Sequence, residues 1–347
     1  MKVSREVTCS GYRCAFGSTT LDIRAAITDL IIQAIESDGL PPWRKGWKTS
    51  TELNFNLLSG NCYSGMNQLI LLMQGRADPR WLTLKQCDRL DGQVSVRKGE
   101  HGVRLVRMVS VDRQRAEREA GSEHGGEVVA QEGSNALVMK TFTVFNASQI
   151  DGLAPLPERL SDTKPHEAIE AIVHGMQDTG MKLNFGGNSP AYWVRQDAIH
   201  IPVAADFEDI GQFHSTLAHE ICHASGHPKR LARLHLDARF GSSEYAREEL
   251  RAELGSIFLL ATLGGELAPS KAMLESNAAY ISSWLDALRR DKGEIFRAAA
   301  DAQRICDYLS ERALAAQPKV FDSPKEQVTE VANEFIQARA PLRRALG

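Results

Sequence analysis

The apolar residues of this chain recur every three to four positions over several long stretches, which is the spacing of helices that bury one face. This pattern predicts helices over residues 18–38, up to Leu72, and over 166–179, 213–224, 243–263, 277–290 and 292–310. Ser18, Thr19 or Thr20 can cap the first of these helices, and the segment 39–42, which contains Gly and two Pro, ends it. The carboxyl half is therefore expected to be mostly helical.

Shorter runs of β-branched and aromatic residues predict strands, mainly in the amino half. Gly92–Gly102 has the composition of a strand followed by a basic turn, with Val103–Val109 as the returning strand. Leu137–Phe145 predicts a further strand, and Tyr192–Pro202 predicts a hairpin in the carboxyl half. The segment Asp112–Gly133 is charged and Gly-rich, so we expect a flexible insertion there.

This distribution of elements indicates the α+β class and two domains with separate cores. A polar, Pro-containing stretch at 153–165 has the composition of a linker. The expected order is a disordered extension (1–17), a small α+β domain (18–152), the linker (153–165), a mostly helical domain with a small sheet (166–312) and a carboxyl-terminal tail (313–347).

Composition narrows the class of protein further. The sequence has no apolar run long enough for a membrane helix, and its amino end does not have the pattern of a signal peptide. The six cysteines are scattered without a C-x-x-C pair, which favours reduced thiols. These features indicate a cytoplasmic protein without a membrane partner.

Charge is unevenly distributed, although the net charge is only −3. Residues 39–110 carry 11 Lys and Arg against 5 Asp and Glu, and the cluster Trp43-Arg44-Lys45-Gly46-Trp47-Lys48 lies within them. Indole rings stack on unpaired bases and cations neutralise phosphates, so this cluster favours binding to single-stranded nucleic acid. In the alternative interpretation, Trp43 and Trp47 clamp the loop onto the core.

One motif in the carboxyl half indicates metal chemistry. His219-Glu220-Ile221-Cys222-His223 is an H-E-x-x-H sequence within a predicted helix. Positions four apart share a helix face, so His219 and His223 can point two imidazoles at one metal ion while Glu220 reaches a metal-bound water. We interpret Cys222 as a buried packing residue.

Catalytic zinc usually has a third protein ligand besides an open position for water. The helix predicted over 243–263 offers Glu249 as that ligand, with Glu253 placed to accept the second ring N–H of a ligating histidine. The roles of these two glutamates can be exchanged, and His227 is another candidate. Glu248 is rotated by about a hundred degrees from Glu249, so both are not expected to ligate.

Two other residues near the motif have competing interpretations. Tyr245 can donate a hydrogen bond to a developing oxyanion or serve as an apolar wedge at a helix start. His200 is interpreted as a structural residue, because a strand does not place it at the spacing of the metal pair.

The expected cofactor is Zn²⁺, although Mn²⁺ or Co²⁺ can occupy the same ligands. Zinc lowers the pKa of its bound water toward about 7, and Glu220 can then take a proton from that water as it attacks a peptide carbonyl. Two alternatives remain, namely a polar helix face that binds no metal and a closed metal site that only stabilises the domain.

Several motifs together resemble one protein family. They are WRKGW (43–47), YSGMN (63–67), DPRWLT (78–83), VRKGEHGV (96–103), TFTVFNASQIDGL (141–153), HEICHASGHPKRL (219–231) and FGSSEYAREELRAELGSIFL (240–259). Over residues 18–309 the sequence is similar to the plasmid-encoded ArdC antirestriction family, from which the charged insertion at 112–133 departs.

The resemblance implies a single-stranded-DNA-binding amino-terminal domain followed by a zincin-type metallopeptidase domain of the H-E-x-x-H, gluzincin-like kind. Candidate DNA-binding residues, taken from the clusters above and from the motifs that carry the resemblance, are Trp43, Arg44, Lys45, Trp47, Lys48, Tyr63, Asn67, Arg80, Trp81, Arg97 and Lys98. The implied role is to coat plasmid DNA during conjugation and protect it from host restriction. The alternative is an active zinc endopeptidase that cleaves a host or plasmid protein, with DNA binding serving only to localise it.

Overall fold

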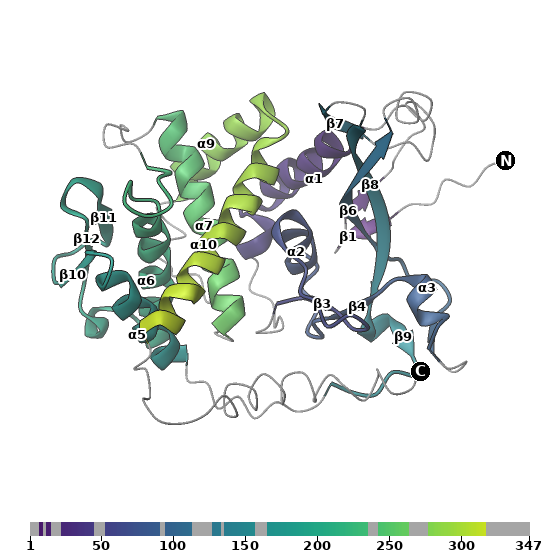
Figure 1. Cartoon of the computed structure of the whole chain (residues 1–347), viewed down its shortest axis with the longest axis horizontal. Helices are drawn as coiled ribbons and strands as arrows, with labels where there is room; N and C mark the ends of the chain where they lie inside the picture. Colours follow the sequence, from purple (N-terminus) through teal and green to yellow (C-terminus); the bar gives the residue numbers. More distant parts are fainter. Residues whose placement is uncertain are drawn as a thin grey trace.

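An amino-terminal part built around a sheet lies beside a carboxyl-terminal part built mainly from helices (Figure 1). The computed structural model describes residues 7–9, 12–14, 22–44, 53–90, 94–112, 127–132, 135–156, 165–234, 242–263 and 277–316. Helix α10 (Glu294–Ala316) runs between the two parts (Figure 1). This arrangement confirms the α+β class and the two-part architecture that the sequence predicts.

The amino-terminal sheet is built on two long antiparallel strands, β6 (Val103–Asp112) and β8 (Asn135–Asn146). They pair continuously from Val103 opposite Val144 to Asp112 opposite Asn135. The strand order is β3-β4-β8-β6, and β7 also pairs with β8. The shorter strands are β3 (Phe55–Asn56), β4 (Arg80–Leu82) and β7 (Glu127–Glu132).

The helices that accompany this sheet are α1 (Ile23–Asp38), α2 (Gly65–Leu72) and α3 (Leu84–Cys87), with a 3-10 turn at Pro42–Arg44. Helix α1 begins later than the sequence predicts, because Asp22 is its cap and accepts a hydrogen bond from the Ala25 N–H at 2.9 Å. Gly39 ends the helix in the left-handed region at a φ of 67°. The expected caps Ser18, Thr19 and Thr20 lie outside the described residues.

The hairpin predicted across the basic turn is wrong. Strand β5 (Ser95–Val96) pairs antiparallel with β9 (Ile150–Asp151), which follows a 3-10 turn at Ala147–Gln149. Strand β6 pairs with β8 instead. The physical reason is length, since β8 offers all 10 residues of β6 a partner, whereas β5 has only 2 residues.

Two segments expected to lack regular structure contain strands. Strands β1 (Val7–Cys9) and β2 (Tyr12–Cys14) form an antiparallel pair within the predicted extension. Strand β7 lies within the predicted insertion and pairs antiparallel with β8. Residues 113–126 of that insertion lie outside the described residues.

The carboxyl-terminal part packs its helices beside a three-stranded sheet of order β10-β12-β11. Its elements are α5 (Pro165–Gln177), β10 (Lys182–Phe185), β11 (Ala191–Trp193), β12 (Ala198–Ile201), α6 (Ile210–Ser225), α7 (Ser243–Leu263), α9 (Asn277–Arg290) and α10, with 3-10 turns at Val194–Gln196 and Ala204–Asp206. Strand β11 is antiparallel to β12, which confirms the predicted hairpin and places β11 at a sheet edge. None of the helices that the structure describes is both long enough and apolar enough to span a membrane.

The two parts share one apolar core, so the expectation of separate cores is wrong. Buried members of this core come from both parts and include Ile31, Leu69, Leu105, Leu217, Trp284 and Ile305. Polar contacts reinforce the junction, since the Thr28 hydroxyl donates to the Lys292 carbonyl at 2.7 Å. Helices α5 and α10 cross closely at Gly175, where a Cβ would lie 2.2 Å from the Arg312 carbonyl oxygen.

Candidate metal centre and nucleic-acid interface

Helix α6 carries the H-E-x-x-H residues. Asp209 fixes the start of this helix, because its side chain accepts a hydrogen bond from the Gln212 N–H at 2.8 Å. The four-residue spacing then puts two imidazoles on one face. The Nε2 atoms of His219 and His223 are 3.1 Å apart, and their rings are nearly perpendicular at 83°.

Helix α7 supplies the third donor. The two carboxylate oxygens of Glu249 each lie 3.5 Å from one Nε2 atom, Oε2 from that of His219 and Oε1 from that of His223. Among the residues that the structure describes, these three offer ligand atoms that all lie within 4.8 Å of one another. Two imidazole nitrogens and a carboxylate oxygen are a donor set that suits zinc and related divalent ions, so the residues present fit a metal.

Two more glutamates of α7 lie near the outer nitrogens of the same imidazoles. Glu253 Oε2 lies 4.0 Å from His219 Nδ1, and Glu248 Oε1 lies 3.6 Å from His223 Nδ1. Glu248 also accepts a hydrogen bond from Arg233 at 2.9 Å. Carboxylates in this position orient the rings of ligating histidines.

Sequence reasoning missed the role of Glu248. Glu248 is rotated from Glu249 around α7, so the sequence argued against two ligands from these positions. The same rotation places Glu248 Oε1 near the outer nitrogen of His223. Arg233, which precedes Glu248 by fifteen residues, could have indicated this role, because its guanidinium group needs a buried acidic partner.

The charges of this cluster are mutually dependent. Burial alone would lower the pKa of His223, but Glu249 and Glu248 raise that pKa well above its usual value. Burial would raise the pKa of Glu249, but the neighbouring imidazoles of His223 and His219 lower it strongly. Both shifts favour a protonated His223 beside an ionised Glu249, whereas a metal ion requires the neutral imidazole.

Glu220 is buried beside the metal-facing imidazoles, and burial raises its pKa. The backbone N–H of Tyr192 on the edge strand β11 hydrogen-bonds this carboxyl group. A carboxyl group with a raised pKa suits a general base that must also return its proton. The arrangement links Glu220 to the edge of the sheet.

His227, the other predicted metal candidate, lies in a different network, and Tyr245 and His200 were singled out for other roles. His227 Nδ1 accepts a hydrogen bond from the Lys229 N–H at 3.2 Å and lies 3.9 Å from Asp197 Oδ2, so it belongs to a different polar network. Tyr245 is half-buried at the start of α7. His200 stacks against Trp193 with ring centroids 4.3 Å apart, which agrees with its interpretation as a structural residue.

A buried arginine that the sequence did not single out ties the hairpin to the end of α6. The side chain of Arg230 is 0% exposed and donates to the Ala224 carbonyl at 2.6 Å. It also forms an ion pair with Asp197, which lies at the hairpin turn at a φ of 49°. Both Asp197 and Arg230 hydrogen-bond the Tyr192 hydroxyl, so this network fixes β11 next to α6.

Several residues predicted to bind DNA are structural instead. Trp81 is fully buried, and its indole N–H donates to Asn54 Oδ1 at 2.7 Å. Arg80 is buried in an ion pair with Asp78 at 2.7 Å. Asn67 makes two hydrogen bonds, at 2.7 and 2.9 Å, to the carbonyl and N–H of Val106 on β6. These contacts use the groups that would have to face DNA, so the prediction is corrected for Trp81, Arg80 and Asn67.

The tryptophan-rich cluster is only partly described. Trp43 is buried, and its ring centroid lies 6.5 Å from that of Trp284. This placement corresponds to the alternative in which Trp43 anchors its loop to the core. Lys45, Trp47 and Lys48 lie outside the described residues, as does the side chain of Arg44.

The remaining three DNA candidates are partly or fully accessible. Tyr63 is half-buried, and its hydroxyl accepts a hydrogen bond from Asn56 at 3.3 Å. Lys98 is exposed in the turn before Gly99, which has a φ of 90°. Arg97 is exposed too, but it pairs with Glu100 at 3.0 Å and Asp151 at 3.3 Å.

Two family models match separate halves of the chain. Residues 21–145 match the N-terminal domain of anti-restriction factor ArdC, and residues 167–301 match a zincin-like metallopeptidase. An uncharacterized protein of Sinorhizobium fredii, y4eC, is 36% identical over 311 residues, covering 86% of this chain and 95% of the relative. The DNA primase TraC of Escherichia coli is 36% identical over 323 residues, which cover 90% of this chain but 28% of the primase. The chain therefore spans less than a third of that primase.

Two solved structures resemble the whole fold. The metal-free crystal structure of the antirestriction protein ArdC from plasmid R388 has a TM-score of 0.66 and 32% sequence identity, covering 85% of this chain and 99% of that one. The Mn(II)-bound structure of the same protein has a TM-score of 0.65 at 32% identity, covering 87% of this chain and 100% of that one. A relative of this chain thus binds Mn(II). Together with the two domain matches, these similarities show that the chain belongs to the ArdC antirestriction family and carries a zincin-like domain.

Proposed function

We propose that this protein binds single-stranded DNA and protects DNA that enters a cell by conjugation from host restriction. The observation that carries the proposal is the similarity to ArdC over almost its entire length, including the amino-terminal domain match at residues 21–145. The basic excess of residues 39–110 supports it, because phosphate neutralisation supplies most non-specific affinity for DNA. The proposed location is the cytoplasm, where incoming DNA meets restriction enzymes.

We assign this role to residues 18–152, with 153–165 as the linker, 166–312 as the metallopeptidase-like domain, and 1–17 and 313–347 as flanking segments. Arg44, Lys45, Trp47, Lys48, Tyr63, Arg97 and Lys98 remain the proposed DNA contacts. Lys98 has the most direct support, since it is exposed at a turn within the basic segment.

The test is binding of the full-length protein to single- and double-stranded oligonucleotides of one sequence across a salt series. Tight binding that prefers the single strand and weakens steeply with salt is expected. The full chain is needed because α1 and α2 share a core with α9 and α10, so a fragment ending at the linker would expose apolar surface. Absence of any DNA binding at low salt would overturn the proposal.

The metal centre supports a second function, that of a zinc-dependent endopeptidase acting on a host or plasmid protein. His219, His223 and Glu249 would hold Zn²⁺, with Mn²⁺ as the alternative ion. Bound there, the metal would activate water and polarise a peptide carbonyl. Glu220 would take a proton from the attacking water and return it to the leaving amine, while Glu253 and Glu248 keep the imidazoles oriented.

The fixed edge strand supports this second function as well. Strand β11 is held by Asp197 and Arg230, and its outer edge is the proposed pairing site for an extended peptide beside Glu220. Hydrolysis of a protein substrate that a chelator stops and added Zn²⁺ restores would support the peptidase. Unchanged cleavage after full removal of metal would overturn it.

A further inference from the structure

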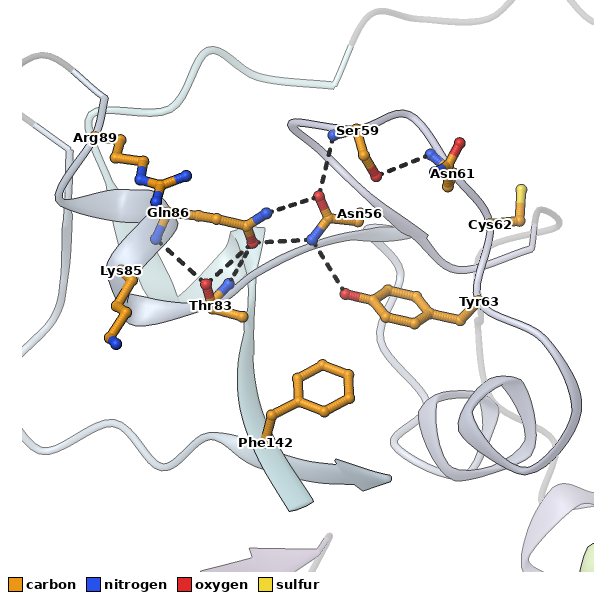
Figure 2. Close-up of a pocket in the computed structure, with 10 residues that line it drawn as sticks. All are labelled: Asn56, Ser59, Asn61, Cys62, Tyr63, Thr83, Lys85, Gln86, Arg89 and Phe142. Carbon is orange, nitrogen blue, oxygen red and sulfur yellow. Dashed lines mark hydrogen bonds between the residues drawn. The ribbon is translucent and has the colours of Figure 1, made fainter. Parts of the chain in front are cut away.

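An open cavity of about 420 Å³, lined by aromatic and hydrogen-bonding side chains, lies on the amino-terminal part, far along the chain from the metal centre (Figure 2). It lies between the β3 segment, the α3 segment and β8, and its size falls in the range of roughly 300–1,000 Å³ found for small-ligand sites. The side chains that matter for its chemistry are Asn56, Tyr63, Lys85, Gln86, Arg89 and Phe142. Of these, Tyr63 and Phe142 lie within the sequence motifs that carry the family resemblance.

The inner wall of the cavity is a preformed amide network (Figure 2). Asn56 and Gln86 form a reciprocal pair, with Asn56 Nδ2 donating to Gln86 Oε1 at 2.9 Å and Gln86 Nε2 donating to Asn56 Oδ1 at 3.1 Å. The Thr83 N–H also donates to Gln86 Oε1 at 2.9 Å. These bonds fix the wall without a ligand, and the second N–H of the Gln86 amide remains a possible donor to one.

Two aromatic rings border the same space. The Tyr63 hydroxyl points to Asn56 and accepts its hydrogen bond, which leaves the phenolic O–H able to donate to a ligand (Figure 2). Burial raises the pKa of Tyr63 and so keeps that proton in place. Phe142 projects from β8 and is half-buried. Ring faces beside hydrogen-bonding groups are what a flat heteroaromatic ligand such as a nucleobase requires.

The charged residues of the lining are both cations. Lys85 and Arg89 are four positions apart and exposed at the rim of the cavity. A phosphate attached to a base inside the cavity would meet them, since backbone charge lies outside the base plane. The aromatic rings, the amide network and the two cations therefore lie in the order in which a nucleotide would present its base, its hydrogen-bonding groups and its phosphate.

We propose that this cavity binds one unstacked nucleotide of single-stranded DNA, with the base against Phe142 and Tyr63 and its phosphate at Lys85 and Arg89. The inference rests on the proposed DNA-binding function and adds the site that distinguishes single from double strands. In a duplex the base is stacked and paired, so entry would require the base to be extruded from the stack.

The experiment compares the full-length protein with three variants on a dT oligonucleotide, using fluorescence anisotropy across a salt series. The variants are Phe142→Leu, which removes the ring but keeps apolar volume, Tyr63→Phe, which removes only the hydroxyl, and Lys85→Gln/Arg89→Gln. Matched controls are Phe185→Leu on β10 and Lys182→Gln/Arg304→Gln, all at exposed positions of the carboxyl-terminal part.

Phe142→Leu should lower affinity for single-stranded DNA by roughly 5- to 100-fold without changing the salt slope, because one base stack is lost. The Lys85→Gln/Arg89→Gln variant should instead reduce the salt slope by about 0.7, the value for one phosphate contact on a single strand. A 2-aminopurine placed within the oligonucleotide should change its fluorescence on binding to the wild type and not to Phe142→Leu. Melting curves identify any variant that fails to fold. If Phe142→Leu does not fold, Tyr63→Phe still tests the cavity, because it removes only the hydroxyl and retains the ring.

The two proposals fail differently. If the wild type binds single-stranded DNA but all three pocket variants bind as it does, the nucleotide site is wrong and the DNA-binding function stands. If the wild type binds no DNA, both are wrong. Saturable binding of free dTMP that the oligonucleotide does not displace would assign the cavity to a free nucleotide and overturn the site proposed here.

Discussion

The metal-ligand residues and the DNA-binding residues were both predicted from short motifs, but the structure places the two sets of residues differently. His219, His223 and Glu249 offer ligand atoms within 4.8 Å of one another, and helical spacing predicts the pairing of the two histidines. Trp81, from a motif that resembles the same family, lies in the apolar core instead, and Arg80 is buried in an ion pair with Asp78. A motif defined by helical spacing fixes geometry, whereas a motif defined by composition fixes only proximity along the chain.

The physical reason is that aromatic and guanidinium groups serve burial as readily as binding. A tryptophan buries roughly 150–250 Å², and its N–H then needs a single partner, which Asn54 provides for Trp81. An imidazole pair four positions apart beside a buried carboxylate has fewer structural uses. Substitutions in the two sets of residues test this difference, and the largest effect is expected at the metal centre.

The most severe test of the metal centre is Glu220→Gln. If Glu220 is the general base, cleavage of a chelator-sensitive protein substrate should fall by roughly 10²- to 10⁴-fold. Bound metal, measured by elemental analysis, should remain at the wild-type level because the three ligands are intact. Glu244→Gln, an exposed change in the first turn of α7, is the control and should leave both readouts unchanged. Equal activity of Glu220→Gln and wild type would contradict the assigned role.

The matching test of the amino-terminal part is Trp81→Ala. Removing a fully buried indole should lower the free energy of unfolding by about 3–5 kcal/mol. Chemical denaturation measures this loss, and Trp193→Ala is the control because Trp193 is 48% exposed. A Trp81→Ala protein of unchanged stability but weakened DNA binding would return Trp81 to the interface.

The sequence determines some parts of the fold and of the site and leaves others open. Helices α7 and α9 have the predicted bounds, because their apolar periodicity is long and uninterrupted. The pairing of β5 with β9 and the shared core were not predictable, since both depend on contacts between segments distant in sequence. Spacing within one helix placed Glu249 and Glu253 on a shared face, so both were predicted near the metal. Glu248 was missed because its contacts with His223 and Arg233 depend on residues of other segments.

Glu248→Gln sharpens the description of the metal centre. Loss of a carboxylate that orients a ligating imidazole typically costs roughly 10- to 100-fold in metal affinity. The expected result is weaker Zn²⁺ binding in competition with a chromophoric chelator, without loss of the fold. Glu244→Gln again serves as the control. Unchanged affinity would show that Glu248 only neutralises Arg233.

The pH dependence of metal binding tests the same contact. Glu249 and Glu248 raise the pKa of His223, so the imidazole stays protonated to a higher pH than an ordinary histidine. Metal needs the neutral ring, so affinity should rise with pH, by up to about tenfold per unit for one displaced proton, and level off above the raised pKa. In Glu248→Gln that pKa falls, so the plateau should begin at lower pH. Calorimetry in buffers of different ionisation enthalpy counts the protons released, and wild type and variant profiles that level off together would contradict the assignment.

The smallest expected effect concerns the exposed basic turn, where composition remains the main argument. Lys98→Gln should reduce the slope of log affinity against log salt by about 0.7, the value for one lost phosphate contact on a single strand. Arg97→Gln should change the slope less, because Arg97 already pairs with Glu100 and Asp151. The comparison is sensitive because the two residues are adjacent and differ in their acidic partners. A larger change for Arg97→Gln than for Lys98→Gln would mean that DNA displaces those carboxylates and that the turn rearranges on binding.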